Sequence, residues 1–137
     1  MRSLKTLIKL AKDEVDKRRK ELADIEARQQ KLMEEHANIS VQIKKEGEAV
    51  KEFPECAITY AKFLQKSLKR QEDIMRTIKQ LQIAADKKRQ ELQEAFGEQK
   101  KLEIVLERKI EEQYKAQLKH EQLQLDEIAG RKVTSFL

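Results

Sequence analysis

The chain has 137 residues, of which 40% are charged, and it contains three glycines, one proline and no tryptophan. Apolar residues make up 39% of the chain, and the mean hydropathy is -0.82. This composition excludes a broad globular core, but the periodic spacing of the apolar residues predicts a solvated helical rod rather than disorder. No apolar run approaches the length needed to span a bilayer, and the single cysteine, Cys56, fits a reducing cytosol. We therefore expect a soluble cytoplasmic protein.

The first part of the chain carries a heptad repeat, in which apolar residues recur at alternating steps of three and four. We call this stripe the seam. Its predicted members are Leu4, Ile8, Ala11, Val15, Arg18, Leu22, Ile25, Gln29, Leu32, His36, Ile39, Ile43, Glu46, Val50 and Phe53. A helix with so narrow an apolar stripe is not stable alone, because it must bury the stripe against another helix. The repeat predicts a coiled-coil helix over about residues 3–52.

A turn is predicted over about residues 47–55, around Pro54. Proline lacks an amide hydrogen and restricts the residue before it, so a helix is expected to end there and another to begin. The second helix is expected to extend from about residue 54 to residue 129. Gly130, followed by Arg131 and Lys132, predicts its end and a frayed tail over residues 130–137.

The second helix carries a weaker seam, which we expect to pair with the first in an antiparallel hairpin. Its predicted members are Ala61, Leu64, Leu68, Gln71, Met75, Ile78, Gln82, Ala85, Arg89, Leu92 and Phe96. With the turn near residue 54, Arg18 is expected opposite Glu91, His36 opposite Asp73, and Gln29 within a turn of Gln82. Matching polar residues in this way avoids the cost of unpaired polar groups in the seam. Tyr60 and Phe63 lie off the predicted stripe, and Phe63, expected to point largely into solvent, is a candidate partner contact.

Charge is distributed so that the two helices complement each other. Residues 21–61 hold nine acidic and five basic side chains, whereas residues 62–89 hold three acidic and nine basic ones. Most of these charges are expected to be a solvated surface. The basic cluster that contains Arg18 and Arg19 is a candidate contact with an acidic protein ring, because complementary charge steers such an encounter.

The second helix is predicted to extend beyond the first, since the lengths are roughly 110 Å and 75 Å at 1.5 Å per residue. The first helix has no residues left to pair beyond about Leu106. There the heptad gives way to four-residue steps, which shifts the apolar face of the helix. The apolar residues of this segment are Leu106, Ile110, Tyr114, Leu118, Leu125 and Ile128. An apolar stripe without an intramolecular partner predicts an interaction surface or a dimer seam, and we favour the interaction surface.

Residues that typically carry catalysis are not grouped in this sequence. His36 and His120 are far apart and lack metal-ligand spacing, and no phosphate-binding glycine loop or nucleophile motif is present. We expect no catalytic residue, no metal and no cofactor, and hence no enzyme. Nucleic-acid binding is a weaker alternative, because the basic clusters are interrupted by acidic residues, and we expect no nucleic-acid partner. A structural coiled coil that forms homo-oligomers also remains open.

Nearly the whole chain resembles the FliJ family, the soluble stalk protein of the flagellar type III export apparatus, and particularly its alphaproteobacterial form. The resemblance depends on the order and spacing of five segments, namely residues 3–10, 14–22, 60–65, 94–103 and 124–129. Within the family, the residue that matches the Tyr-x-x-Phe aromatic and contacts the gate is here Phe63. Ser67 and Arg70 depart from the smaller or more apolar residues expected on that face.

The resemblance implies an all-α, long antiparallel two-helix coiled-coil hairpin, similar to the central shaft of rotary ATPases. It also implies binding in the hexameric flagellar export ATPase, and contact with the cytoplasmic part of the membrane export gate and with export chaperones. Localisation would then be cytoplasmic, at the membrane-associated export apparatus. Combined with the exposed stripe, the resemblance predicts that Tyr114, Leu118, Leu125 and Ile128 contact the ring, together with the start of the first helix.

Overall fold

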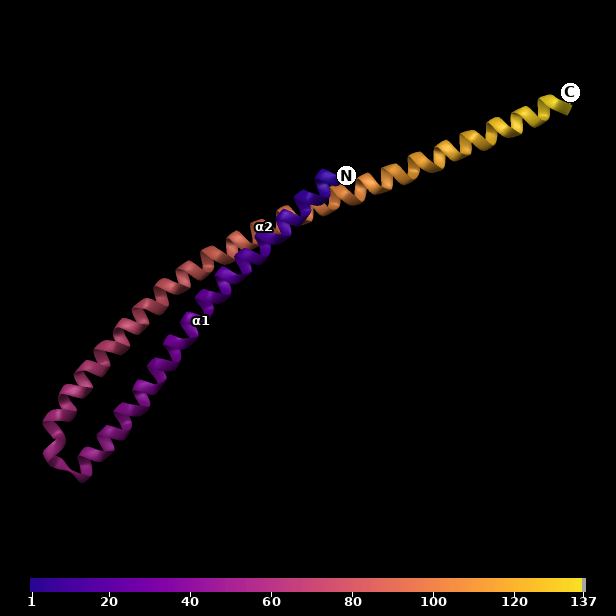
Figure 1. The fold of residues 1–137 in the computed structure, drawn as a ribbon. Coiled ribbons are helices and arrows are strands. Elements are labelled where there is room, and N and C mark those ends of the chain that lie inside the picture. The colour runs from indigo at the N-terminus through magenta and orange to yellow at the C-terminus, as the bar shows by residue number, and fades with distance from the viewer. Residues whose placement is uncertain (137) are drawn as a thin grey trace. The chain divides into compact units, whose positions relative to one another are not determined.

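A computed structural model describes residues 1–136, with the backbone alone for residues 133–136. It contains helix α1, Arg2–Glu52, a 3₁₀ turn η1, Pro54–Cys56, and helix α2, Ala57–Phe136. On either side of the turn, α1 and α2 lie side by side and run in opposite directions (Figure 1). The predicted all-α antiparallel hairpin is therefore confirmed.

The turn forms where proline chemistry requires it. Phe53, the residue before Pro54, has φ −126° and ψ 78°, which lie outside the helical region. A proline disfavours helical backbone angles in the residue that precedes it, because its ring clashes with that residue. The Cys56 amide donates to the Phe53 carbonyl at 3.0 Å, which closes the 3₁₀ turn before α2 begins. The chain thus reverses direction within the four residues from Phe53 to Cys56, which are the whole connection between α1 and α2.

The chain divides into two compact units, which share both helices. The first comprises residues 1–15 and 94–137, and the second comprises residues 16–93 with the turn. Among the side chains that the structure describes, Ile8 and Val15 are buried in the first unit, and Ile74 and Ala85 in the second. So few buried residues are typical of a two-helix seam, where most contacting side chains remain partly exposed.

The seam of α1 follows the heptad repeat almost throughout. Every predicted position from Leu4 to Ile43, and Val50, is buried or half-buried. Glu46 and Phe53 are exposed instead, and the half-buried Gly47 takes the layer predicted for Glu46. A glycine in this layer lets the backbone of α1 approach a large side chain on α2, as described below for Tyr60.

The seam of α2 matches the prediction at every second position only. Leu64, Gln71, Ile78, Ala85 and Leu92 are buried or half-buried, as predicted. The alternate members are wrong by one residue: Tyr60, Ser67, Ile74, Leu81, Lys88 and Ala95 face α1, in place of Ala61, Leu68, Met75, Gln82, Arg89 and Phe96. This arrangement buries Ile74 in place of Met75 and turns Leu81 rather than Gln82 toward α1, which removes one polar side chain from the seam. Ser67 and Lys88 bring polar side chains to two other layers.

The polar pairs test the predicted register. Arg18 Nη1 donates to Glu91 Oε2 at 2.8 Å, and Gln29 Nε2 donates to Gln82 Oε1 at 3.1 Å, so both pairings are confirmed. The pairing of His36 with Asp73 is wrong. Gln71 Nε2 instead donates to the His36 carbonyl at 3.0 Å and to Ser40 Oγ at 2.8 Å. Asp73 forms an ion pair at 3.3 Å with Arg76, a permanently charged partner one turn away on its own helix.

The C-terminal end of α2 lies beyond the position expected from the sequence. The helix continues through Gly130 to Phe136, and no glycine of the described residues has the positive φ of a helix-ending glycine. One glycine costs a helix only about 1 kcal/mol relative to alanine, too little to end one so long. Leu137, the last residue of the expected tail, lies outside the described residues. No helix in the described part of the chain is long and apolar enough to cross a membrane.

Candidate partner-binding surfaces

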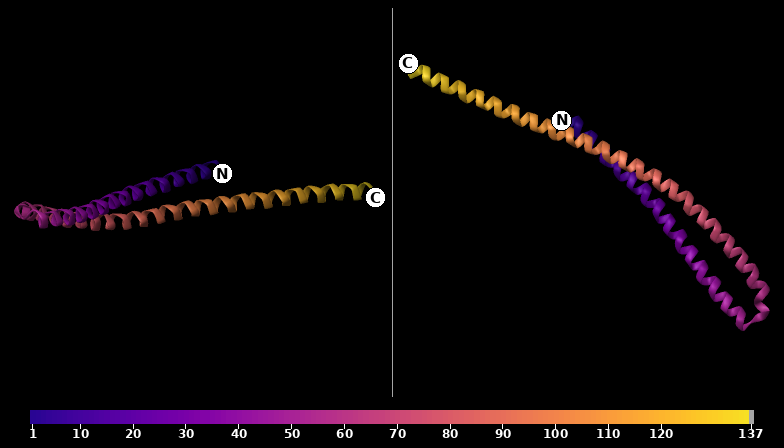
Figure 2. Two further views of the ribbon diagram at one scale, coloured as in Figure 1. Left: turned by 90° about the horizontal axis from the view of Figure 1, so that it is seen from below. Right: turned by 180° about the vertical axis from the view of Figure 1, so that it is seen from behind.

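The first candidate surface lies on α2 beyond the end of its pairing with α1. Leu106 is the last half-buried residue, and every side chain from residue 107 to residue 132 is exposed. We call residues 107–132 the overhang. Within this unit, α2 continues past the N-terminal end of α1 with no other segment beside it (Figure 2). The helix pair therefore ends near Leu106, as the difference in helix length predicted.

Four predicted contact residues form an apolar stripe along the overhang. Tyr114 is 64% exposed, Leu118 46%, Leu125 62% and Ile128 50%. Large apolar side chains spaced at helical intervals along one face are a common form of helix-in-groove recognition. The exposure of the stripe makes it available to a partner, and contact with a partner stays a prediction.

The stripe faces a different direction from the seam of the same helix. Extending the seam beyond Leu106 by its alternating steps leads to Lys109, Gln113 and Ala116, which line a shallow pocket with Met1. Leu118 and Leu125 lie nearly half a turn around α2 from that line, at about 100° per residue. A partner that binds the stripe can therefore approach α2 without displacing the start of α1.

Arg18, a predicted partner contact, belongs to a charge cluster inside the hairpin. It contacts Glu91 at 2.8 Å and Glu21 at 3.6 Å, and Lys88 Nζ lies 2.8 Å from Glu21 and 3.3 Å from Glu91. The hydrogen bond from Lys88 lowers the pKa of the Glu21 carboxyl, and hydrogen bonds to Glu21 and Glu91 raise the pKa of Lys88. These contacts stabilise the register of the hairpin, so Arg18 already has a structural role.

Arg19 is more accessible than Arg18. Its side chain is 60% exposed, and its ion pair with Asp16 on the same helix is long at 3.9 Å. Pairs of this kind contribute little to stability, because water and salt screen them. Of the two arginines, Arg19 is the one whose guanidinium group a partner carboxylate reaches without breaking a contact between the helices.

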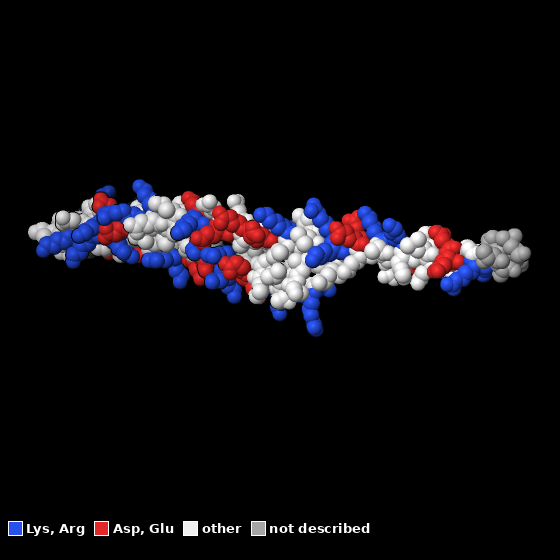
Figure 3. Space-filling model, turned by 90° about the horizontal axis from the view of Figure 1, so that it is seen from above, with Lys and Arg blue, Asp and Glu red and all other residues white. Residues whose placement is uncertain are grey.

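Charge elsewhere is interspersed rather than segregated. On the face drawn in Figure 3, acidic and basic side chains alternate along the described residues. Two ion pairs besides the cluster join the acidic stretch of α1 to the basic stretch of α2, Glu35 with Arg70 at 2.9 Å and Glu26 with Arg89 at 3.1 Å. The predicted charge complementarity of the helices is thus realised within the hairpin.

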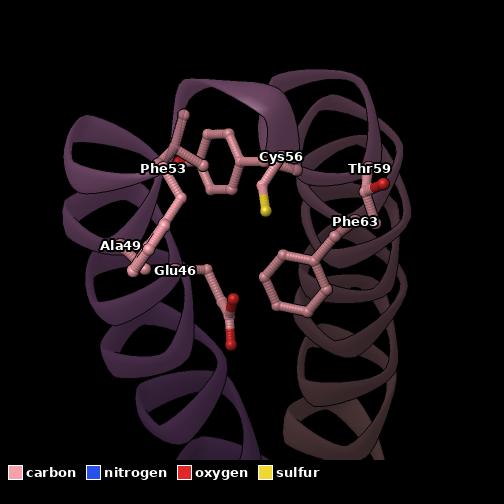
Figure 4. Close-up of a pocket in the computed structure, with 8 residues that line it drawn as sticks. Glu46, Ala49, Phe53, Cys56, Thr59 and Phe63 are labelled. Atoms are coloured by element: carbon pink, nitrogen blue, oxygen red, sulfur yellow. The ribbon is translucent and has the colours of Figure 1, made fainter.

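Phe63 lies on α2 near the turn. It was predicted to point into solvent, and it does not. It is half-buried and lines a pocket of about 330 Å³ between the helices. Figure 4 shows its ring extending from α2 toward α1, with Phe53 across the pocket and the Cys56 thiol and Glu46 carboxylate nearby. The prediction was wrong because the α2 seam is shifted by one residue, which turns Tyr60 and Phe63 inward. A partner side chain must therefore enter this turn pocket to reach Phe63.

The sequence reasoning missed the contact between Tyr60 and Gly47. A Cβ atom added to Gly47 would lie 3.0 Å from Tyr60 Oη and 3.4 Å from its Cζ, so the phenol ring lies directly on the backbone of α1. A glycine inside an otherwise regular heptad, beside a glutamate in the predicted seam, was the available signal.

In the described part of the chain, no group of three or more His, Cys, Asp or Glu residues is placed to hold a metal ion.

The fold and its surfaces define a class of protein, the coiled-coil hairpin with a helical extension that carries an exposed apolar stripe. Comparison with protein families identifies the member of this class. The family model described as Flagellar FliJ protein matches residues 1–135, and the chain belongs to the FliJ family. It is accordingly a component of the flagellar export apparatus. Neither a curated protein nor a solved structure matches the chain.

Proposed function

We propose that this protein is the non-enzymatic stalk of the flagellar export ATPase, acting in the cytoplasm at the export apparatus. The overhang and the start of α1 enter the central hole of the hexameric ring and promote its assembly and turnover. The end of the hairpin that contains the turn contacts the cytoplasmic part of the export gate, and the protein also contacts export chaperones. Family membership and the exposed stripe on the overhang together support this function.

The stripe is the observation on which the ring contact depends. Several large apolar side chains along one unpaired helix face are unfavourable in water, because their apolar surface is hydrated unless a partner covers it. A single helix is about 10–12 Å across, so the overhang fits a narrower opening than the paired helices do. The stripe supplies binding energy, and the stiffness of the helix transmits an orientation from ring to gate without chemistry in the stalk.

The test is the ATP turnover of the cognate export ATPase with and without the protein, together with electron microscopy of its oligomeric state. We expect the wild type to raise turnover and the number of rings. A variant with Leu118→Gln and Leu125→Gln should bind at least about tenfold more weakly, because two interface leucines are lost. Leu123→Gln is the matched control, since Leu123 is 58% exposed but lies off the stripe.

Two outcomes would contradict the ring contact. If the control weakened ring assembly as much as the stripe variant, the effect would not be specific to the stripe. If the wild type changed neither turnover nor ring number, the protein would act at the gate, with chaperones or as a structural coiled coil. Sedimentation of the free protein separates the last case, because self-association through the stripe would be lost in the Leu118 and Leu125 variant.

The gate contact is tested separately at the turn pocket. Phe63→Ala should reduce binding to the soluble part of the gate protein while leaving ring assembly unchanged, because the pocket is in the unit that contains the turn and not in the overhang. Ile58→Ala is a control, since Ile58 is 75% exposed near the turn but does not line the pocket. Equal gate binding by wild type and Phe63→Ala would exclude the turn pocket as the contact.

A further inference from the structure

The turn end of the hairpin is packed differently from the rest of its unit. Ile74 and Ala85 are buried, but residues 37–70 contain no buried side chain. In residues 41–69 the described chain also has no hydrogen bond or ion pair between the helices. The last such contacts are those of Gln71 with His36 and Ser40, and that of Arg70 with Glu35. We call residues 41–69 the turn end.

One contact stands out within the turn end. The Tyr60 ring lies on the backbone of α1 at Gly47, where a Cβ would come within 3.0 Å of the hydroxyl oxygen. Pockets lie on both sides of this contact. The turn pocket, of about 330 Å³, includes Tyr60, and a second pocket of about 440 Å³ is lined by Tyr60, Gly47, Ile43 and charged side chains of α1. The Tyr60 ring thus packs closely against α1 at Gly47 and is bordered by a pocket on each side of that contact.

We propose that Tyr60 packed on Gly47 is a latch that holds the turn end closed, and that the turn end opens locally when this contact is released. Backbone hydrogen bonds within each helix survive such opening, so its cost is confined to side-chain contacts between the helices. These contacts are few in the turn end, and segments with few buried apolar contacts open before the rest of a protein. The polar layer of Gln71, His36 and Ser40 is where the separation stops.

Opening changes the surface that a partner meets. Ile43, Val50 and Leu64 are half-buried between the helices in the closed form and become accessible in the open one. The two pockets beside Tyr60 then join into one groove, with apolar side chains from the turn pocket and charged side chains of α1 along the second pocket. This inference does not depend on the stalk function, because it concerns an equilibrium of the isolated protein.

The test is the distance distribution between two spin labels, measured by pulsed electron paramagnetic resonance on the full chain with Cys56→Ser. One pair, Lys45→Cys with Lys62→Cys, reports on the turn end. The other, Ala23→Cys with Lys87→Cys, reports on the helix pair nearer the buried Ala85. All four sites are exposed, so the labels do not disturb the seam. Circular dichroism checks that each variant remains helical.

In Tyr60→Ala we expect the population of longer distances at the turn end to be about threefold or more that of the labelled protein that retains Tyr60. The second label pair should keep its distance distribution. Tyr60→Phe keeps the ring on Gly47 and should behave like the wild type. The proposal is overturned if Tyr60→Ala leaves the turn-end distribution unchanged, or if both pairs broaden together. Broadening in Tyr60→Phe as large as in Tyr60→Ala would overturn it too, because ring packing would then not be the latch.

Discussion

Gly47 and Gly97 are both helical glycines, and they differ in what a methyl group would meet. A Cβ on Gly47 contacts the Tyr60 hydroxyl at 3.0 Å, whereas a Cβ on Gly97 has nothing within 4 Å. Replacing a helical glycine by alanine gains about 1 kcal/mol of helix stability. We expect Gly97→Ala to raise the free energy of unfolding by about that amount, as measured by urea unfolding followed by circular dichroism.

Gly47→Ala carries the same helix gain but must move the rigid Tyr60 ring. We expect its net gain to be smaller than that of Gly97→Ala, or negative. Combining Gly47→Ala with Tyr60→Ala removes the clash, so the double variant should recover the helix gain relative to Tyr60→Ala alone. Equal stabilisation by Gly47→Ala and Gly97→Ala would show that the phenol ring does not rest on the backbone of α1.

Three carboxyl groups make stability depend on pH. Lys88 lowers the pKa of Glu21, Arg70 lowers that of Glu35, and Gln99 lowers that of Glu103, each through a hydrogen bond to the ionised form. The folded chain therefore holds these protons less tightly than the unfolded chain does. Their contribution is complete above the ordinary carboxyl pKa of 4.5 and is lost as the pH falls through the lower folded values.

We expect the urea concentration at the unfolding midpoint to decrease as the pH is lowered from about 5 to about 3, because ordinary carboxyl pKa values are about 4. In Glu21→Gln the fall should be smaller, because one of the titrating groups is gone. High salt should weaken the dependence, since the charges are only partly shielded from water. An equally steep fall in Glu21→Gln would mean that the Lys88 contact does not persist in solution.

At the scale of the element, the decisive feature of α2 is which of two neighbouring residues faces α1. Ile74 is 1% exposed, whereas Met75, the predicted seam residue, is 42% exposed. Truncating a buried isoleucine to alanine costs about 2–5 kcal/mol, and truncating a half-exposed side chain costs much less. We expect Ile74→Ala to lower the free energy of unfolding severalfold more than Met75→Ala. The reverse order would restore the predicted seam.

The pairing of the helices was predictable to the extent that the heptad was unambiguous. In α1 the repeat of seam positions is long and regular, so it predicts the seam from Leu4 to Ile43 even though Leu7, Leu10 and Met33 are apolar neighbours of seam residues that prove to be exposed. In α2, Ile74 and Met75, or Ala95 and Phe96, are adjacent apolar candidates, and spacing alone does not choose between them. Choosing requires knowledge of which side chain fits against α1, and that is a property of the pair rather than of either helix.

The same limit explains the errors at the candidate surfaces. The exposure of Leu118 and Leu125 follows from the unequal helix lengths, a global quantity that the sequence contains. The inward orientation of Phe63 depends on the one-residue shift of the α2 seam, and so does the contact of Tyr60 with Gly47. The pairing of His36 with Asp73 failed because Arg76, on the same helix as Asp73, competes for its carboxylate.

At the scale of the whole molecule, the overhang separates folding from binding. None of its side chains is buried, so residues 118–132 add nothing to the seam between the helices. An isolated helix of this length is only marginally stable in water. The apolar residues of this segment therefore do not stabilise the hairpin. Exposed apolar residues of this kind are expected of a surface that binds a partner.

Deleting residues 118–137 should therefore leave the thermal midpoint of the hairpin within about 2 °C of the wild type, because no described contact of α1 is lost. Deleting residues 1–11 instead removes Ile8, which is 7% exposed, and should lower the midpoint clearly. Both are measured by circular dichroism, with ring binding assayed in parallel. Only the first deletion is expected to abolish ring binding while the hairpin remains folded. A large loss of stability on deleting residues 118–137 would show that the overhang is part of the folded core, and its apolar stripe would then need no partner to explain it.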